Sequence, residues 1–208
     1  MIAEIYHKTS SRLEDELTGD FFGIMRYIPF QNGLKQLLEK RVKSKDELVF
    51  CMLAKIKENK FDFEFWKRSE TGLGEIDGYL EIENLAIGIE VKYLSGLSGE
   101  DQLEREAGML KEWCRGGERL LLLVADESVA QDIYLDNYTK KCFQKVHLGY
   151  ITWQDMLLGL DDVITTTRYE EIMIEDLKEL LREKGFVAFD GFTCKGLKIN
   201  RGKYYEFG

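Results

Sequence analysis

The chain has 208 residues, of which 44% are hydrophobic and 12% aromatic, with a single proline, so its composition excludes a disordered or low-complexity protein. Its length favours one domain. Its net charge of -9 argues against a protein that coats nucleic acid non-specifically, because such binding depends on lysine and arginine at the phosphates.

Two helices are expected before the first strand. Residues 11–25 carry one apolar stripe behind the capping residue Ser11, and Pro29 ends this helix. Apolar residues recur at four-residue spacing over 44–59, which predicts the second helix. Residues 61–66, FDFEFW, alternate aromatic and acidic side chains, a pattern typical of a strand.

Strands and helices then alternate. Residues 74–83 and 85–93 predict two further strands, a helix begins near Ser98, and the apolar run 119–125 indicates a strand covered on both faces. The remaining predicted elements are a helix over about 129–139, a strand over 145–152, a short helix capped by Thr152 and Asp155, a helix over about 169–184 stopped by Gly185, and an edge strand or hairpin over 196–207. This order predicts an α/β fold with a mixed central sheet flanked by helices.

Cysteine usage and hydropathy indicate a cellular compartment. The cysteines lie far apart and form no CxxC pair, so no disulfide framework, zinc site or iron–sulfur cluster is predicted; they are Cys51, Cys114, Cys142 and Cys194. The N-terminus carries no apolar signal core, and the longest apolar run, 120–125, is too short to span a bilayer. We therefore expect a soluble, cytoplasmic protein with no membrane partner.

Two segments of this acidic chain are basic. Residues 35–45 hold five basic residues against Glu39, and residues 195–208 hold four against Glu206. Such patches could guide a phosphate backbone to a local site, but solvated helix faces and tails give the same pattern, so both interpretations stand.

A hairpin between the second and third strands carries the candidate chemistry. Glu83 and Asn84 are the polar break, and a two-residue turn there pairs residues whose numbers add up to 167. One face then holds the apolar pairs Ile76–Val91, Gly78–Ile89, Leu80–Ile87 and Ile82–Leu85. The other face holds the pairs Glu75–Lys92, Asp77–Glu90, Tyr79–Gly88 and Glu81–Ala86. Because a one-residue slip would mix the two faces, the clean separation supports this register.

The second face of this hairpin predicts a metal site. Asp77 and Glu90 become cross-strand neighbours, and two like charges so close are destabilising unless a cation lies between them. Mg²⁺ is the natural cation, with Lys92 pointing to the same side, and the small residues Ala86 and Gly88 leave room for a ligand. The alternative is a solvent-exposed charged face on which Glu75 pairs with Lys92.

These residues resemble the PD-(D/E)XK nuclease superfamily, which has the restriction-endonuclease-like fold. The match consists of Asp77 in GEIDG and Glu90-Val91-Lys92 in GIEVKY, with Gln102 in DQLERE downstream and Glu14 in SRLEDELTGDFFG upstream. The resemblance covers roughly residues 11–151. It implies a single nuclease-like domain over 1–208, with a core at about 11–151 and a C-terminal helical and edge-strand extension at about 152–208. One departure is that Ile76, not proline, precedes Asp77.

The resemblance also implies a mechanism. Asp77 and Glu90 would bind Mg²⁺, for which Mn²⁺ can substitute, with the Val91 carbonyl and Glu14 as further ligands. Lys92 would position or deprotonate the attacking water, and Gln102 would orient Lys92 or a phosphate. The implied reaction is phosphodiester hydrolysis in nucleic acid, DNA more than RNA, with a homodimer as one open arrangement.

Alternatives remain for two residues and for the function. Glu14 could instead complete a capping box with Ser11, in which case Glu16 is the first-helix acid, and Gln102 could be an ordinary polar residue of a first helical turn. The rival functions are a non-catalytic binding or scaffold protein that keeps the nuclease fold, and an acidic protein-interaction domain.

Overall fold

The computed structural model describes residues 13–93 and 95–187. The predicted capping residue Ser11, Cys194, the tail strand or hairpin at 196–207 and the basic segment 195–208 lie outside these ranges.

The centre of the fold is a mixed five-stranded sheet, which confirms the predicted fold class. The strands lie side by side in chain order, β1-β2-β3-β4-β5. The first three pair antiparallel, whereas β4 runs parallel to β3 and β5 parallel to β4. Their bounds are β1 (Asp62–Arg68), β2 (Glu75–Ile82), β3 (Leu85–Val91), β4 (Glu118–Ala125) and β5 (His147–Thr152).

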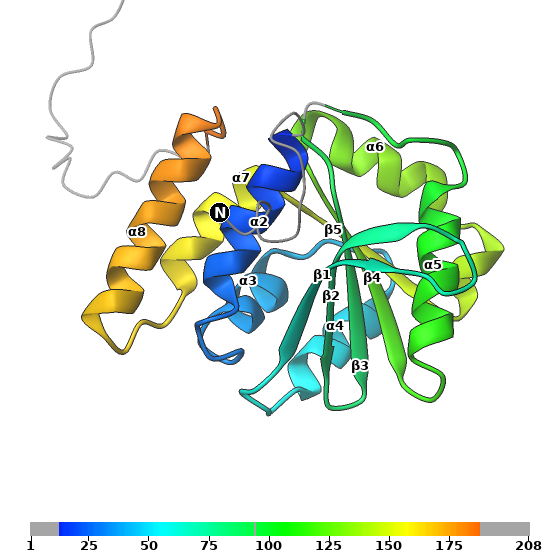
Figure 1. Cartoon of the computed structure of the whole chain (residues 1–208), viewed down its shortest axis with the longest axis horizontal. Coiled ribbons are helices and arrows are strands. Elements are labelled where there is room, and N and C mark those ends of the chain that lie inside the picture. Colours follow the sequence, from blue (N-terminus) through cyan, green and yellow to red (C-terminus); the bar gives the residue numbers. More distant parts are fainter. Residues whose placement is uncertain (1–12, 94, 188–208) are drawn as a thin grey trace, which may run out of the picture.

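Helices cover both faces of the sheet (Figure 1). One face carries α5 (Gln102–Trp113), α6 (Glu127–Asn137) and the short η1 (Lys141–Gln144). The other carries α2 (Leu13–Met25), α3 (Leu34–Arg41), α4 (Glu47–Lys55), α7 (Trp153–Gly159), the short η2 (Leu160–Asp162) and α8 (Arg168–Glu183). Within the described ranges, none of these helices has both the length and the apolar character needed to cross a membrane.

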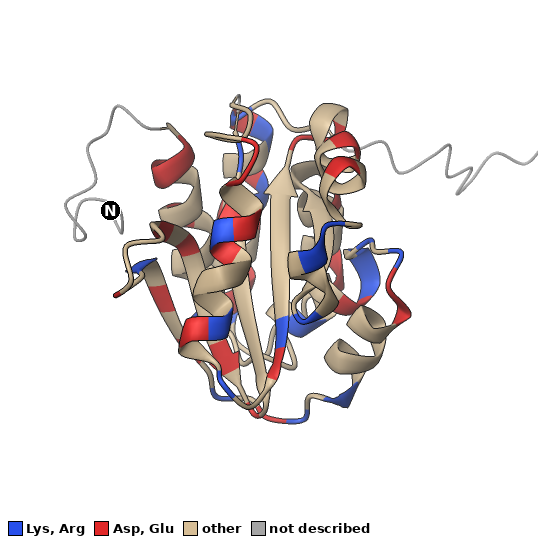
Figure 2. Cartoon of the chain, turned by 90° about the vertical axis from the view of Figure 1, so that its right-hand side faces the viewer, with Lys and Arg blue, Asp and Glu red and all other residues tan. Residues whose placement is uncertain are grey.

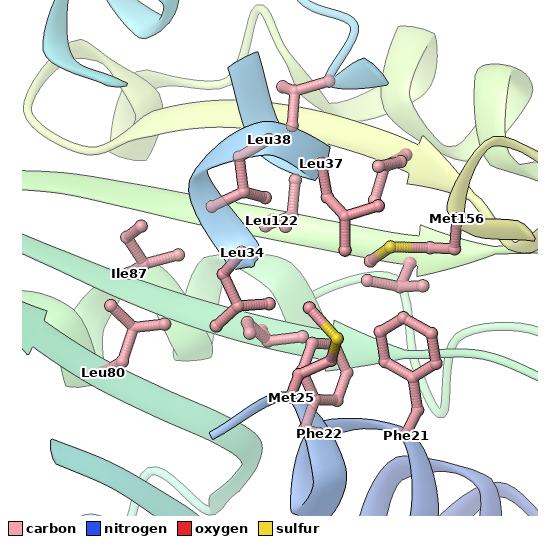
Figure 3. Close-up of a cluster of buried hydrophobic side chains, with 14 of the residues drawn as sticks. Phe21, Phe22, Met25, Leu34, Leu37, Leu38, Leu80, Ile87, Leu122 and Met156 are labelled. Atoms are coloured by element: carbon pink, nitrogen blue, oxygen red, sulfur yellow. The ribbon is translucent and has the colours of Figure 1, made fainter. Parts of the chain in front are cut away.

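The larger hydrophobic core fills the space between the sheet and α2, α3, α7 and α8. Figure 3 shows side chains of α2, α3, α7 and the strands meeting there, among them Phe21, Phe22, Leu34, Leu37, Leu80, Ile87, Leu122 and Met156. Full burial of each such side chain stabilises the fold by about 1.5–3 kcal/mol. This packing fixes α2 against the sheet, so its first turn lies beside the end of β3, where Lys92 Nζ donates to Glu14 Oε1 at 3.2 Å.

One helix was missed and another was predicted too long. The segment predicted only as a basic patch contains most of α3, although its Leu34, Leu37 and Leu38 recur at helical spacing. The second predicted helix is shorter than 44–59, because Ile56 is already extended. Its carbonyl accepts hydrogen bonds from Gln31 Nε2 at 2.9 Å and Lys35 Nζ at 2.5 Å, which end α4 at this point.

Long-range ion pairs neutralise most of the basic segment 35–45. Lys40 and Arg41 both bind Asp162, at 3.1 and 2.8 Å, and Lys43 binds Asp155 at 2.6 Å. In the view of Figure 2, basic and acidic residues are interspersed over the helices. The structure therefore favours the interpretation of this segment as a structural helix face.

The predicted hairpin register is confirmed over most of its length. The five pairs from Gly78–Ile89 to Ile82–Leu85 form as expected. Beyond them the ladder opens, and the predicted pair Asp77–Glu90 is replaced by a side-chain contact in which Val91 N–H donates to Asp77 Oδ2 at 2.8 Å. Asp77 is thereby tied to β3 through its carboxylate.

The alternation of β2 breaks at the same point. Ile76 was expected on the apolar face with Leu80, but it packs in the second core cluster, under α5. On the neighbouring strand Trp66 has a φ of 49°, and the β1–β2 pairs continue in one register on either side of Trp66 and Asp77. In both strands the side chains therefore change faces at this point while the strands stay paired. This local change of backbone conformation cannot be predicted from the alternation of side chains.

The small residues of β3 make room for α5, which corrects the expectation that they leave space for a ligand. A Cβ on Gly88 would lie 2.6 Å from Ile76 Cδ1 and 2.9 Å from Leu110 Cδ2. Ala86 is fully buried in the same cluster.

We expect Gly88→Ala to lower the free energy of unfolding by about 1–3 kcal/mol, because the added methyl overpacks this contact. Urea denaturation measures the change. Gly116→Ala is the matched control, since a Cβ there meets nothing within 4 Å. Equal loss in both variants would contradict the packing argument.

Candidate functional site

An open cavity of about 560 Å³ lies where β2 and β3 meet the first turns of α2 and α5. All five predicted side chains line it: Glu14, Asp77, Glu90, Lys92 and Gln102. They come from two helices and two strands, so the sheet order and the packing of α2 bring them together.

Three carboxylates converge in this cavity. One ligand oxygen each from Glu14, Asp77 and Glu90 lies within 4.8 Å of the others. Glu90 is 3% exposed, whereas Glu14 and Asp77 are half-buried at the opening. A divalent cation sits at about 2.0–2.6 Å from its oxygen ligands, so carboxylates at this spacing fit one such ion.

Lys92 is the cation of the cluster. It is 5% exposed, and its Nζ lies 2.5 Å from Glu90 Oε1 and 3.2 Å from Glu14 Oε1. Its main chain is held by the Val124 carbonyl, which accepts from Lys92 N–H at 2.7 Å, and by Trp153 Nε1–H, which donates to the Lys92 carbonyl at 3.2 Å. The alternative pairing of Lys92 with Glu75 does not form, because Glu75 binds Arg68 Nε at 2.8 Å.

Glu14 belongs to the cavity and Glu16 does not line it. Glu14 Oε2 accepts from Tyr93 N–H at 3.0 Å and from Ser95 Oγ–H, so both of its oxygens are held by the segment that follows β3. Glu16 instead binds Lys184, the residue that follows α8, at 3.2 Å.

Gln102, the first residue of α5, bridges this helix and Glu90. Its Nε2 donates to Glu90 Oε1 at 2.5 Å, and its Oε1 accepts from Ser98 N–H at 2.7 Å. These contacts fix which way the amide points. Gln102 therefore orients the carboxylate of Glu90 and is not an ordinary polar residue of a first helical turn.

Sequence reasoning missed a fourth acid, Glu106. It lies one turn after Gln102 and is 2% exposed, and the neighbouring side chains of Glu90 and Gln102 lower its pKa against the effect of burial. Among the described residues its Oε2 has no hydrogen-bond partner. The signal was present, because Glu106 interrupts the buried helical stripe of Leu103, Ala107 and Leu110 with a charge.

The cluster holds more carboxylates than basic groups, and the pKa values of Asp77, Glu90 and Lys92 are all raised. Burial, and then the charge of Glu90, raises the pKa of Asp77 well above its ordinary value. Burial, and then the charge of Glu106, does the same to the pKa of Glu90. Burial lowers the pKa of Lys92, but Glu90, Glu14 and Asp77 outweigh it and raise this pKa, which keeps Lys92 protonated.

Glu106 makes stability depend on pH. Burial raises its pKa from 4.5 to about 7. Unfolding therefore releases a proton from Glu106 between these pH values, and in EDTA we expect this carboxyl to lower the free energy of unfolding across the window by about 3 kcal/mol, at 1.36 kcal/mol per pKa unit. Asp77 and Glu90, whose pKa values are also raised, add to the fall. Urea denaturation at pH 5 and pH 8 measures the total. Glu106→Gln should reduce it and the exposed Glu118→Gln should not; equal slopes in wild type and Glu106→Gln would contradict this account.

The donor set suits a hard divalent cation. Carboxylate oxygens are the ligands that Mg²⁺ prefers, and a bound cation would supply the positive charge that Asp77 and Glu90 lack. Lys92 adds N–H donors that can reach a water or a phosphate oxygen in the cavity. The role of the Val91 carbonyl as a metal ligand stays a prediction.

Comparisons with known proteins return little. No family model matches the chain, and no curated protein matches it. Among solved structures it is similar to the small subunit of the heterodimeric restriction endonuclease R.BspD6I, at 19% sequence identity and a TM-score of 0.32. This similarity covers 59% of the present chain and 76% of that subunit.

Proposed function

We propose that the chain is a Mg²⁺-dependent nuclease of the PD-(D/E)XK type, which hydrolyses phosphodiester bonds. One observation carries the proposal: the carboxylates of Glu14, Asp77 and Glu90 lie within 4.8 Å of one another around a buried lysine, at the wall of an open cavity. A surface-exposed acidic cluster would have neither the buried lysine nor the ordered partners on its carboxylates.

The proposal divides the residues of the site among three roles: holding the cation, donating to the water or phosphate, and positioning the carboxylates. Asp77, Glu90 and Glu14 hold the cation, which when bound polarises the phosphate and lowers the pKa of a bound water. Lys92 stays protonated, so it donates to the attacking water or to a phosphate oxygen and offsets the charge that develops on phosphorus. Gln102 holds Glu90, while Tyr93 N–H and Ser95 hold Glu14.

The preferred substrate is DNA, which follows from the resemblance of the motif to the nuclease superfamily. The charge of the protein does not by itself favour DNA as the substrate. The net charge is -9, and three basic residues of the segment 35–45 are already bound to Asp155 and Asp162. We therefore expect cleavage to depend on local contacts at the cavity, rather than on long-range attraction of the phosphate backbone.

Cleavage assays test the proposal. Linear, supercoiled, single-stranded and branched DNA, with RNA beside them, are incubated with the full chain in MgCl₂, MnCl₂ or EDTA. We expect cleavage of at least one DNA form with either metal, and none in EDTA. Glu90→Gln should lower the rate by about 10²–10³-fold, the usual effect of removing one preorganised group that stabilises a transition state. The matched control is Glu118→Gln, an exposed acid at the start of β4.

Three results would overturn the proposal. Cleavage that survives in EDTA, or that Glu90→Gln leaves unchanged, would identify a contaminating enzyme. Metal-dependent stabilisation without cleavage of any nucleic acid would favour the non-catalytic scaffold.

A further inference from the structure

A second and larger cavity, of about 860 Å³, adjoins the candidate site between α6 and residues 95–100. It shares Lys92, Ser95 and Gly96 with the first cavity. Its wall has an apolar stripe, formed by Leu97, Val129 and Ile133. We call this cavity the α6 groove.

The rim of the α6 groove is acidic. Glu100, Asp132 and Asp136 are exposed there, and among the described residues none of the three forms an ion pair. The one lysine on the α6 side, Lys140, binds Glu104 at 3.0 Å. The groove therefore offers an apolar wall beside uncompensated negative charge, which suits a ligand that is both apolar and cationic.

A buried amide adds an acceptor to this groove. Asn137 is 4% exposed and lines the groove; its Nδ2 donates to the Ile133 carbonyl at 2.8 Å, which fixes the orientation of the amide. Its Oδ1 has no hydrogen-bond partner among the described residues. A buried acceptor without a partner is costly, so the groove calls for a donor as well as for positive charge.

The chain itself supplies a segment with these properties. Residues 195–208 carry four basic residues against one acidic residue, and apolar or aromatic residues are interleaved with them. The described chain ends beyond α8 and close to the site: the Phe186 ring lies 5.4 Å from the ring of Tyr93, whose neighbour Lys92 lines both cavities. Twenty-one residues follow Val187, and a fully extended chain spans about 3.3 Å per residue, so they can reach the groove.

We propose that the basic segment 195–208 docks in the α6 groove of its own chain. Its lysine and arginine side chains bind the rim carboxylates, and its apolar side chains cover the wall formed by Val129 and Ile133. A phosphate backbone is a poor rival occupant, because the three rim carboxylates repel it. The inference does not rest on nuclease activity.

Limited proteolysis of the full chain tests the docking. Trypsin cleaves after lysine and arginine, and mass spectrometry follows the release of peptides that end at Lys195, Lys198, Arg201 or Lys203. The variant Asp132→Asn with Asp136→Asn changes the groove and leaves the tail sequence intact. We expect tail cleavage about 2- to 30-fold faster than in wild type, the range that loss of two surface ion pairs predicts. NaCl at high concentration should have the same effect on wild type, because it screens these pairs.

The control replaces two exposed acids at the opposite end of the sheet, Asp62→Asn with Glu118→Gln, and should cleave at the wild-type rate. A second groove variant, Val129→Lys, should also speed cleavage by repelling the basic tail; circular dichroism checks that each variant is folded. Wild-type rates in both groove variants would overturn the proposal. So would protection that grows with protein concentration, which indicates a second copy, or protection that needs added DNA, which indicates a nucleic-acid arm.

Discussion

Replacing Lys92 with methionine is expected to lower metal-dependent DNA cleavage by about 10²–10³-fold, the usual consequence of losing one preorganised donor at a developing negative charge. Within the described residues, Lys92 is the only cation that forms ion pairs in this cluster, at 2.5 Å from Glu90 and 3.2 Å from Glu14. Methionine keeps a similar length and an apolar stem, so the variant removes the charge and the N–H donors with little change of volume.

The same substitution should destabilise the metal-free protein. Removing one partner of a buried ion pair typically costs about 3–5 kcal/mol, because the remaining charge is left uncompensated. The sign follows from the pKa values: those of Asp77 and Glu90 are already raised with Lys92 present, so without it both acids take up protons at still higher pH. Acidic buffer should therefore restore part of the lost stability.

Activity and stability must be measured together for this variant. Cleavage is assayed in MgCl₂ at a temperature where circular dichroism shows both proteins folded, and Lys60→Met, at an exposed position, is the matched control. Equal cleavage rates for wild type and Lys92→Met would exclude Lys92 from the chemistry. A lower rate caused only by unfolding would disappear on cooling, whereas loss of a catalytic group would persist.

Asp77→Asn should have opposite effects on stability and on activity. Without metal we expect the free energy of unfolding to rise, because burial and the charge of Glu90 raise the pKa of Asp77 and asparagine carries no charge to bury. The expected gain is about 0.5–2 kcal/mol, the range that is common for single stabilising substitutions. Asparagine keeps an oxygen that can accept from Val91 N–H, so the tie between β2 and β3 is retained. With Mg²⁺, cleavage should be lost.

Stability measured against metal concentration shows whether Asp77→Asn acts through loss of metal binding or only through packing. Mg²⁺ or Mn²⁺ at one hundred times its dissociation constant should stabilise the wild type by about 2.7 kcal/mol, and should leave Asp77→Asn nearly unchanged. Thermal denaturation in EDTA and in each metal measures both quantities, with the exposed Asp62→Asn as control. If the metal stabilises wild type and Asp77→Asn equally, the carboxylate cluster is not the binding site.

The sequence was informative wherever a periodic pattern coincided with burial. The register of the hairpin could be predicted because five pairs of β2 and β3 separate apolar from polar side chains cleanly. That register placed Asp77, Glu90 and Lys92 in one cavity, together with Glu14 and Gln102 from two helices.

The features that escaped prediction depend on contacts distant in sequence. Ile76 changes face because Trp66 and Asp77 interrupt two neighbouring strands together. The basic segment 35–45 is neutralised by Asp155 and Asp162, more than one hundred residues away. Glu106 was overlooked because a charge beside an apolar stripe is ordinarily solvated, whereas here it is 2% exposed and lies near Glu90.

The anchoring of Lys92 also decides how this region can fluctuate. Its N–H donates to the carbonyl of Val124 in β4, and its carbonyl accepts from the indole of Trp153 in α7. This indole stacks on Phe186, beyond α8, and meets Phe21 of α2 edge-to-face. Local opening of the backbone at Lys92 therefore disturbs β4, α7 and the packing of Trp153 together, so we expect it to be rare. Slow hydrogen exchange at the Lys92 amide follows.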